Sequence, residues 1–202
     1  MKNLISVTTK KGDTGESFLI SGKKVSKSNI VFEVLGTLDE LNSYLGLVVV
    51  KMKSLKGVKL KSAKEIADNA TFLLEIQNTL FYLGAQLAES SKESLKESLL
   101  LKLENEADRL QTEMAEHWIT KFVLPGGTEL GAHIDIARTV SRRLERLIVG
   151  LSEQKKASQE NKISELVVKY INRLSDYLFI LRCFANDRLS VKENLFDSEK
   201  TC

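Results

Sequence analysis

The sequence predicts an all-α protein: a single-domain five-helix bundle behind a glycine-rich N-terminal loop segment. Apolar residues recur at spacings of three and four over most of the 202 residues, which is the period of an amphipathic helix. Pro125 is the only proline, so long stretches are free of helix breakers. Short polar connections between these stretches are typical of an antiparallel bundle. We expect one domain over 1–202, with a loop region at 1–35, the bundle at about 36–188 and a C-terminal tail at 189–202.

The N-terminal region is the least helical part, because glycines, serines and threonines interrupt it. The only extended piece expected there is short, at Leu4 to Ser6. We expect the first helix to begin at Thr37, since Thr37 and Glu40 have the spacing of a capping box. The apolar stripe of this helix consists of Leu38, Leu41, Leu45 and Val48.

Four further helices follow from the same periodicity. Thr128, directly after the turn Leu124-Pro125-Gly126-Gly127, is the expected N-cap of the fourth. The last helix has the longest apolar series, with Val167, Tyr170, Leu174, Tyr177, Leu178, Leu181 and Phe184 at spacings of three and four. The expected bounds are about 63–88, 95–118, 128–151 and 163–186, with a polar linker at 152–162.

Composition excludes several classes of protein. The formal charge of +3 is a small difference between 30 basic and 27 acidic side chains, which argues against a nucleic-acid partner. The longest apolar run, 45–50, is far shorter than the roughly 20 residues of a membrane-spanning helix. Neither histidine has Glu-x-x-His spacing and the two cysteines fit no metal motif, so we expect no protein metal site. Cys183 is expected to be a buried free thiol, and the location to be cytoplasmic.

Three arginines stand out, because Arg138, Arg142 and Arg146 follow one another at four-residue spacing. Residues four apart share a helix face, so their guanidinium groups line up over about 12 Å. One interpretation is a solvated face paired with acidic residues of neighbouring helices. The other is a clamp for phosphate or carboxylate groups, which suits the forked donors of arginine.

Two other segments are rich in polar groups. Asn172 and Asp176 share a helix face, and Arg173 can pair with Asp176; this is either a polar seam between helices or part of a site. The segment Thr9 to Ser17 is basic and rich in glycine and hydroxyl groups, so it is either a flexible loop or a wrap for phosphates. It lacks the spacing of a Walker loop.

Taken in order, these segments resemble the PduO-type ATP:cob(I)alamin (corrinoid) adenosyltransferase family. The resemblance covers nearly the whole chain, and its strongest blocks are the last three. The matching blocks are 9–15, 25–27, 33–43, 122–127, 137–146 and 170–179. It implies transfer of the 5′-deoxyadenosyl group of ATP to the cobalt of cob(I)alamin, with release of triphosphate. It also implies Mg²⁺, a homotrimer with sites between subunits, and a flavoprotein reductase that supplies reduced corrinoid.

The resemblance also implies site residues. Asp39 and Arg138 would pair across the subunit boundary, and Phe122 would lie under the corrin and help displace the lower axial ligand of cob(II)alamin. A packing anchor for the fourth helix is the alternative for Phe122. The implied ATP-binding residues are Thr9, Lys10, Lys11, Gly12, Ser17, Lys27, Arg142, Glu145, Arg146 and Asn172.

The chain departs from the family pattern at Thr14, Ser28, Asn29 and Asp135, where lysine, acidic residues and histidine are usual. These positions bear on nucleotide affinity and corrinoid preference. Two other functions remain open from the residues. One is a non-catalytic bundle that delivers adenosylcobalamin or senses nucleotide, and the other is a structural bundle whose arginines form an oligomer interface.

Overall fold

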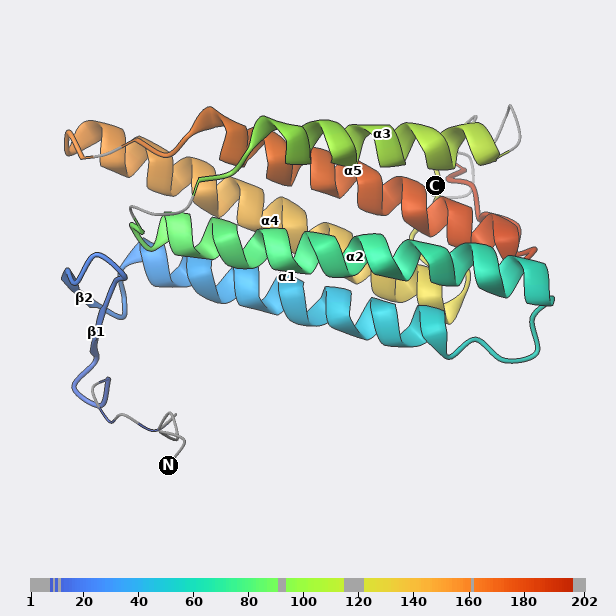
Figure 1. The fold of residues 1–202 in the computed structure, drawn as a ribbon, viewed down its shortest axis with the longest axis horizontal. Coiled ribbons are helices and arrows are strands. Elements are labelled where there is room, and N and C mark those ends of the chain that lie inside the picture. The colour runs from blue at the N-terminus through green and yellow to red at the C-terminus, as the bar shows by residue number, and fades with distance from the viewer. Residues whose placement is uncertain are drawn as a thin grey trace.

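Five long helices lie side by side in the computed structural model, which describes residues 8, 10, 12–90, 94–114, 122–160 and 162–197 (Figure 1). They are α1 (Ile30–Lys53), α2 (Leu60–Leu87), α3 (Glu97–Glu113), α4 (Glu129–Ala157) and α5 (Glu165–Arg188). A hairpin of β1 (Glu16–Phe18) and β2 (Lys24–Ser26) projects at one end. The all-α prediction is confirmed. None of the described helices is long and apolar enough to cross a membrane.

The core lies between the helices. α4 packs against α5 and α1, α1 also packs against α2, and α3 covers α5. In Figure 1 the colour gradient shows α1, α3 and α5 running one way, and α2 and α4 the other. The predicted apolar stripes face this core: Leu41 and Leu45 of α1 and Leu174 and Leu178 of α5 are all fully buried. The hydrophobic period therefore identified the buried faces of α1 and α5 correctly.

The helix starts were predicted with mixed success. Thr128 is the N-cap of α4, since its hydroxyl accepts a hydrogen bond from the Gly131 N–H at 2.9 Å. The capping box at Thr37 is wrong. α1 begins two turns earlier, at Ile30, where Asn29 Oδ1 accepts from the Val31 N–H at 3.0 Å. Thr37 is buried inside the helix.

Other helix bounds differ by a few residues. α4 continues to Ala157, so the first half of the predicted linker is its last turns, and Lys155 lies there with its side chain only 10% exposed. α3 ends at Glu113, short of the predicted residue 118, although residues 115–121 lie outside the described part of the chain.

The hairpin was not predicted. Its strands pair antiparallel, with Ser17 opposite Val25, and Gly22 provides the left-handed turn residue at φ +85°. The Ile20 N–H donates to the Ala88 carbonyl at 3.0 Å, which fastens the turn to the end of α2. The extended piece expected at Leu4 to Ser6 lies outside the described residues.

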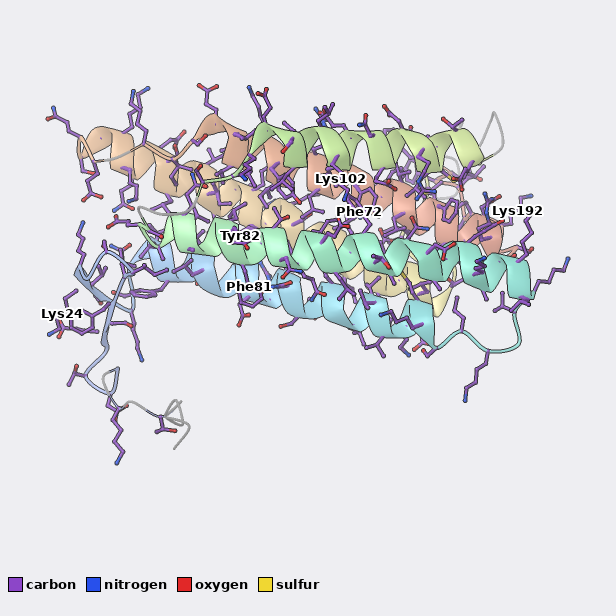
Figure 2. The ribbon with its side chains drawn as sticks, in the orientation of Figure 1. Lys24, Phe72, Phe81, Tyr82, Lys102 and Lys192 are labelled. Atoms are coloured by element: carbon purple, nitrogen blue, oxygen red, sulfur yellow. The ribbon has the colours of Figure 1, made fainter. Side chains whose placement is uncertain are left out.

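Aromatic packing joins three helices in the middle of the bundle. The rings of Phe72 and Tyr177 meet edge to face, with their centroids 5.4 Å apart. The Lys102 ammonium lies 5.6 Å from the centroid of the Phe72 ring, and Figure 2 labels both of these residues. On the same helix as Phe72, Phe81 and Tyr82 are exposed (Figure 2). In the α5 core Cys183 is a buried free thiol, as predicted, and burial raises its pKa to about 11.

Candidate functional site

The glycine-rich loop and β2 meet at Gly12 and Lys27. The end of the Lys27 side chain lies where a Cβ on residue 12 would be, with Nζ only 2.6 Å from that position, so only glycine fits without moving the lysine. The Lys27 N–H also donates to the Gly15 carbonyl at 2.9 Å. The Lys27 ammonium group therefore lies beside the backbone of Gly12, where no side chain covers the peptide groups. Lys10, with φ +57°, is exposed at its start.

Two predicted loop residues, Thr9 and Lys11, lie outside the described part of the chain. Ser17 is described, and it lies half-buried in β1 opposite Val25. Among the predicted loop residues, the structure thus brings together Gly12 and Lys27.

Arg138, Arg142 and Arg146, which we call the arginine stripe, line one face of α4 as predicted. Arg142 and Arg146 are exposed and form no ion pair with any described residue; the Arg146 guanidinium donates to the Arg142 carbonyl at 3.2 Å. By contrast, Arg143 is neutralised by Glu40 of α1. The alternative interpretation, a solvated face paired with acidic residues of a neighbouring helix, therefore applies to Arg143. Arg142 and Arg146 keep their charges available for an anion.

Asn172 and Glu145 link α5 to α4 beside the arginine stripe. The Asn172 amide donates to Glu145 Oε1 at 3.0 Å, and both side chains are half-buried. The predicted pair of Arg173 and Asp176 also forms, at 3.0 Å, and a second carboxylate, Glu104 of α3, accepts from Arg173 at 2.9 Å. The predicted ATP-binding residue Asn172 and the polar pair of Arg173 and Asp176 therefore lie next to each other on α5.

Asp39 and Arg138 do not meet within one chain. Asp39 is exposed on α1 and pairs with no described residue, while Arg138 Nε donates to Asp135 Oδ1 at 3.0 Å. The pairing of Glu40 with Arg143 sets α1 against α4 so that Arg138 lies about 7 Å further along the bundle. The predicted pair of Asp39 and Arg138 is therefore not formed within this chain.

Phe122 precedes α4 and the Leu-Pro-Gly-Gly turn (124–127), and the residue is 84% exposed. Its carbonyl accepts from the Phe196 N–H at 2.7 Å, and the Leu124 N–H donates to the Asn194 carbonyl at 2.7 Å. The backbone is thus held by the C-terminal segment, while the residue is largely exposed. This geometry contradicts the packing-anchor interpretation of Phe122.

A buried polar network under this turn was missed from the sequence. Arg182, 1% exposed, donates to the Leu124 carbonyl at 2.8 Å and to Glu193 at 2.6 Å. Fully buried Asn186 accepts from the Thr128 N–H and hydroxyl and donates to the Gly126 carbonyl. The available signal was a lone arginine inside the apolar run of α5.

Glycines make room for this network. A Cβ on residue 131 would lie 2.6 Å from Asn186 Oδ1, and one on residue 127, at φ +95°, would collide with the same amide. Gly127 is therefore required both by its backbone conformation and by the Asn186 side chain, and Gly131 by the side chain alone.

The departures from the family pattern have local structural roles. Asn29 caps α1, and the Ser28 hydroxyl is 2.8 Å from that of Ser26. Asp135, 6% exposed, lies between Arg138 and Arg182. Thr14 is exposed in the loop, and nothing in the structure explains it.

Comparison with known proteins agrees with this geometry. The model of the family described as Cobalamin adenosyltransferase matches residues 7–185. The corrinoid adenosyltransferase of Bacillus subtilis is 37% identical over 186 residues, covering 91% of this chain and 88% of its own. The corrinoid adenosyltransferase PduO of Citrobacter freundii is 33% identical, and the match spans 49% of its length.

A solved structure shares the fold. It is an alanine-for-phenylalanine variant of the PduO-type ATP:corrinoid adenosyltransferase from Lactobacillus reuteri, complexed with cobalamin and ATP. It superposes with a TM-score of 0.80 at 30% identity, covering 96% of this chain and all of that one. Because the family model and a relative at 37% identity both span most of the chain, the chain belongs to the cobalamin adenosyltransferase family.

Proposed function

We propose that the chain transfers the 5′-deoxyadenosyl group of ATP to the cobalt of cob(I)alamin and releases triphosphate, with Arg142, Arg146, Asn172 and Lys27 binding the nucleotide. The observation that carries the assignment of residues is the unpaired charge of Arg142 and Arg146 next to the Asn172–Glu145 hydrogen bond. Triphosphate is a polyanion, and Arg142 and Arg146 place two guanidinium groups about 6 Å apart along one helix face. Guanidinium groups suit phosphate oxygens because they donate two parallel hydrogen bonds.

The reaction needs stabilisation of a leaving group more than acid–base chemistry. The electron pair of Co(I) forms the bond to the 5′ carbon while the carbon–oxygen bond breaks, and triphosphate leaves with the electron pair of the broken carbon–oxygen bond. Negative charge develops on the phosphate oxygens, where Arg142 and Lys27 donate hydrogen bonds.

A magnesium ion would bind mainly to the phosphates, as Mg²⁺ prefers phosphate and water oxygens with one or two carboxylates. The described residues contain no group of three or more His, Cys, Asp and Glu side chains arranged to hold a metal. Glu145 is the carboxylate that lies beside the nucleotide residues, and its Oε1 already accepts from Asn172.

The corrin would lie against Phe122. An exposed aromatic ring on a backbone held by hydrogen bonds to the C-terminal segment suits a wedge that keeps water and the lower ligand from cobalt. Loss of the lower ligand favours reduction of Co(II) to Co(I), since the accepting orbital falls in energy. A flavoprotein reductase would supply the electron.

We infer a homotrimer in which Asp39 of one copy pairs with Arg138 of the next. Asp39, Leu47 and Val50 form one exposed stripe of α1, so the free carboxylate adjoins apolar surface. A neighbouring α4 that covers this stripe would bury Leu47 and Val50 and give Asp39 a cationic partner. Sedimentation equilibrium should give three times the mass of one chain, and a monomer that retains full activity would overturn this arrangement.

The function is tested by mixing the protein with ATP and chemically reduced corrinoid and following the spectrum of adenosylcobalamin. Product formation with turnover separates the enzyme from a carrier or nucleotide sensor. Arg142→Ala should lower kcat/KM for ATP by roughly tenfold to hundredfold, the equivalent of a charged hydrogen bond of about 1.5 to 3 kcal/mol. Arg143→Ala, which removes the neighbouring arginine paired with Glu40, is the matched control. Equal kinetics for the two variants would remove Arg142 from the site.

A further inference from the structure

One carboxylate connects the arginine stripe to the Leu-Pro-Gly-Gly turn. Asp135 Oδ1 accepts from Arg138 Nε at 3.0 Å, while Oδ2 accepts from the Gly126 N–H at 3.1 Å and lies 3.1 Å from Arg182 Nε. The Arg182 contact is an ion pair without hydrogen-bond alignment. The Asp135 side chain is 8% exposed and that of Arg138 21%. A single carboxyl group therefore contacts the start of α4, the turn and the buried arginine of α5.

Arg182 extends the connection toward Phe122. Its guanidinium donates to the carbonyls of Leu124 and Gly126 at 2.8 and 3.3 Å, and Glu193 balances its charge. The two arginines and two carboxylates form a neutral set in which each buried charge has a partner. Rotation of the Asp135 side chain would break contacts to Arg138 and to the turn together.

We propose that Asp135 is a positioning residue. It fixes the position of Arg138 relative to the turn that follows Phe122, so that one carboxylate positions both the arginine that would pair with Asp39 and the ring that would face the corrin. The inference rests on the proposed function, in which Arg138 braces the subunit boundary and Phe122 faces the corrin. Asp135 itself does not touch substrate in this account. It orients Arg138 toward the neighbouring Asp39 by occupying one edge of the guanidinium group and leaving the other edge free.

The test uses Asp135→Asn and Asp135→Glu in the full-length protein. Asparagine keeps the size of the side chain. Its amide N–H₂ group would face N–H groups of Arg138, Gly126 or Arg182, which are also donors, so one contact is lost. Glutamate keeps the charge that Arg182 requires but moves the carboxylate by about one methylene. A misplacement of this order costs up to about a hundredfold in rate. We expect both variants to lose tenfold or more in kcat with pre-reduced corrinoid and to show less four-coordinate Co(II) by electron paramagnetic resonance. The Tm of Asp135→Glu should stay near the parent value.

The control is Glu106→Gln, which removes a carboxylate from a similar i,i+3 arginine pair on α3, away from the site. It should leave kcat unchanged. A parent-like kcat and four-coordinate signal in Asp135→Glu would overturn the positioning role, even if Asp135→Asn fails to fold. Equal losses from Asp135→Glu in the parent and in an Arg138→Ala background would also overturn it, because the effect would then not pass through Arg138. A parent that forms no adenosylcobalamin would instead count against the proposed function itself.

Discussion

Replacing Phe122 by alanine separates a wedge from a structural anchor. Phe122 is 84% exposed, so about one sixth of its surface is buried in the chain. A phenylalanine has roughly 200 Å² to bury, which leaves about 30 Å² here and about 0.8 kcal/mol at 25 cal/mol per Å². A core phenylalanine costs about 3 to 5 kcal/mol when truncated. Phe122→Ala should therefore cost less than about 1 kcal/mol of unfolding free energy.

Urea unfolding followed by circular dichroism measures this difference. Phe184, which is 1% exposed on α5, gives the matched control, and Phe184→Ala should lose about 3 to 5 kcal/mol. A loss beyond about 2 kcal/mol in Phe122→Ala would return the residue to a packing role.

The activity of the same variant separates the two chemical steps. Phe122→Ala should bind ATP like the parent and adenosylate pre-reduced Co(I) corrinoid with a modest loss. It should fail from Co(II), because nothing then displaces the lower ligand. Electron paramagnetic resonance of Co(II) corrinoid with ATP and protein reports the four-coordinate species directly. If the variant shows as much of this species as the parent, the wedge assignment is refuted.

Two further predictions concern charge pairs. Asp39→Ala and Arg138→Ala should each impair turnover, and the double variant should lose much less than the sum; an additive kinetic cycle would show that they act independently. Lys155, 10% exposed, donates to Glu89 at 2.6 Å, and this bond holds the Glu89 pKa below its usual range. Glu89→Gln should therefore cost about 1.5 to 3 kcal/mol near pH 7. A carboxyl with a lowered pKa stabilises the fold above its unfolded pKa of about 4.3, so the difference should shrink as pH falls below that value. Thermal unfolding from pH 3 to 7 measures it, and a pH-independent difference would exclude the ion pair as the cause.

The helices could be predicted because their signal is repeated many times. In α5, one polar residue in the apolar series would not hide the helical period. In α4, the start is marked because the Thr128 cap directly follows a Pro-Gly-Gly turn. The start of α1 could not be predicted in the same way. Asn29 is an adequate cap, but Gly36 followed by Thr37 and Glu40 resembles a better one. The earlier start was decided by the burial of Val31 and Val34, which only the packed bundle reveals.

The site was predicted in part, for a similar reason. The arginine stripe is visible because its spacing is regular. Whether the charge of the adjacent Arg143 is neutralised depends on Glu40, which lies 103 residues away in the sequence. Asp135 and Arg182 have no local pattern that links them, since one is at the start of α4 and the other near the end of α5. The hairpin was missed because strands of three residues are too short to show alternation.

The C-terminal segment has a consequence for synthesis of the protein. All five helices are complete at Arg188, yet Glu193, Asn194 and Phe196 still have to reach the turn. Synthesis that stops after Arg188 would therefore produce the five described helices without the hydrogen bonds that hold the backbone around Phe122. A nonsense codon just after α5 would encode a chain with every described helix and its apolar interior. Arg182 would lack the Glu193 counter-charge, and the backbone of Phe122 and Leu124 would lack its partners.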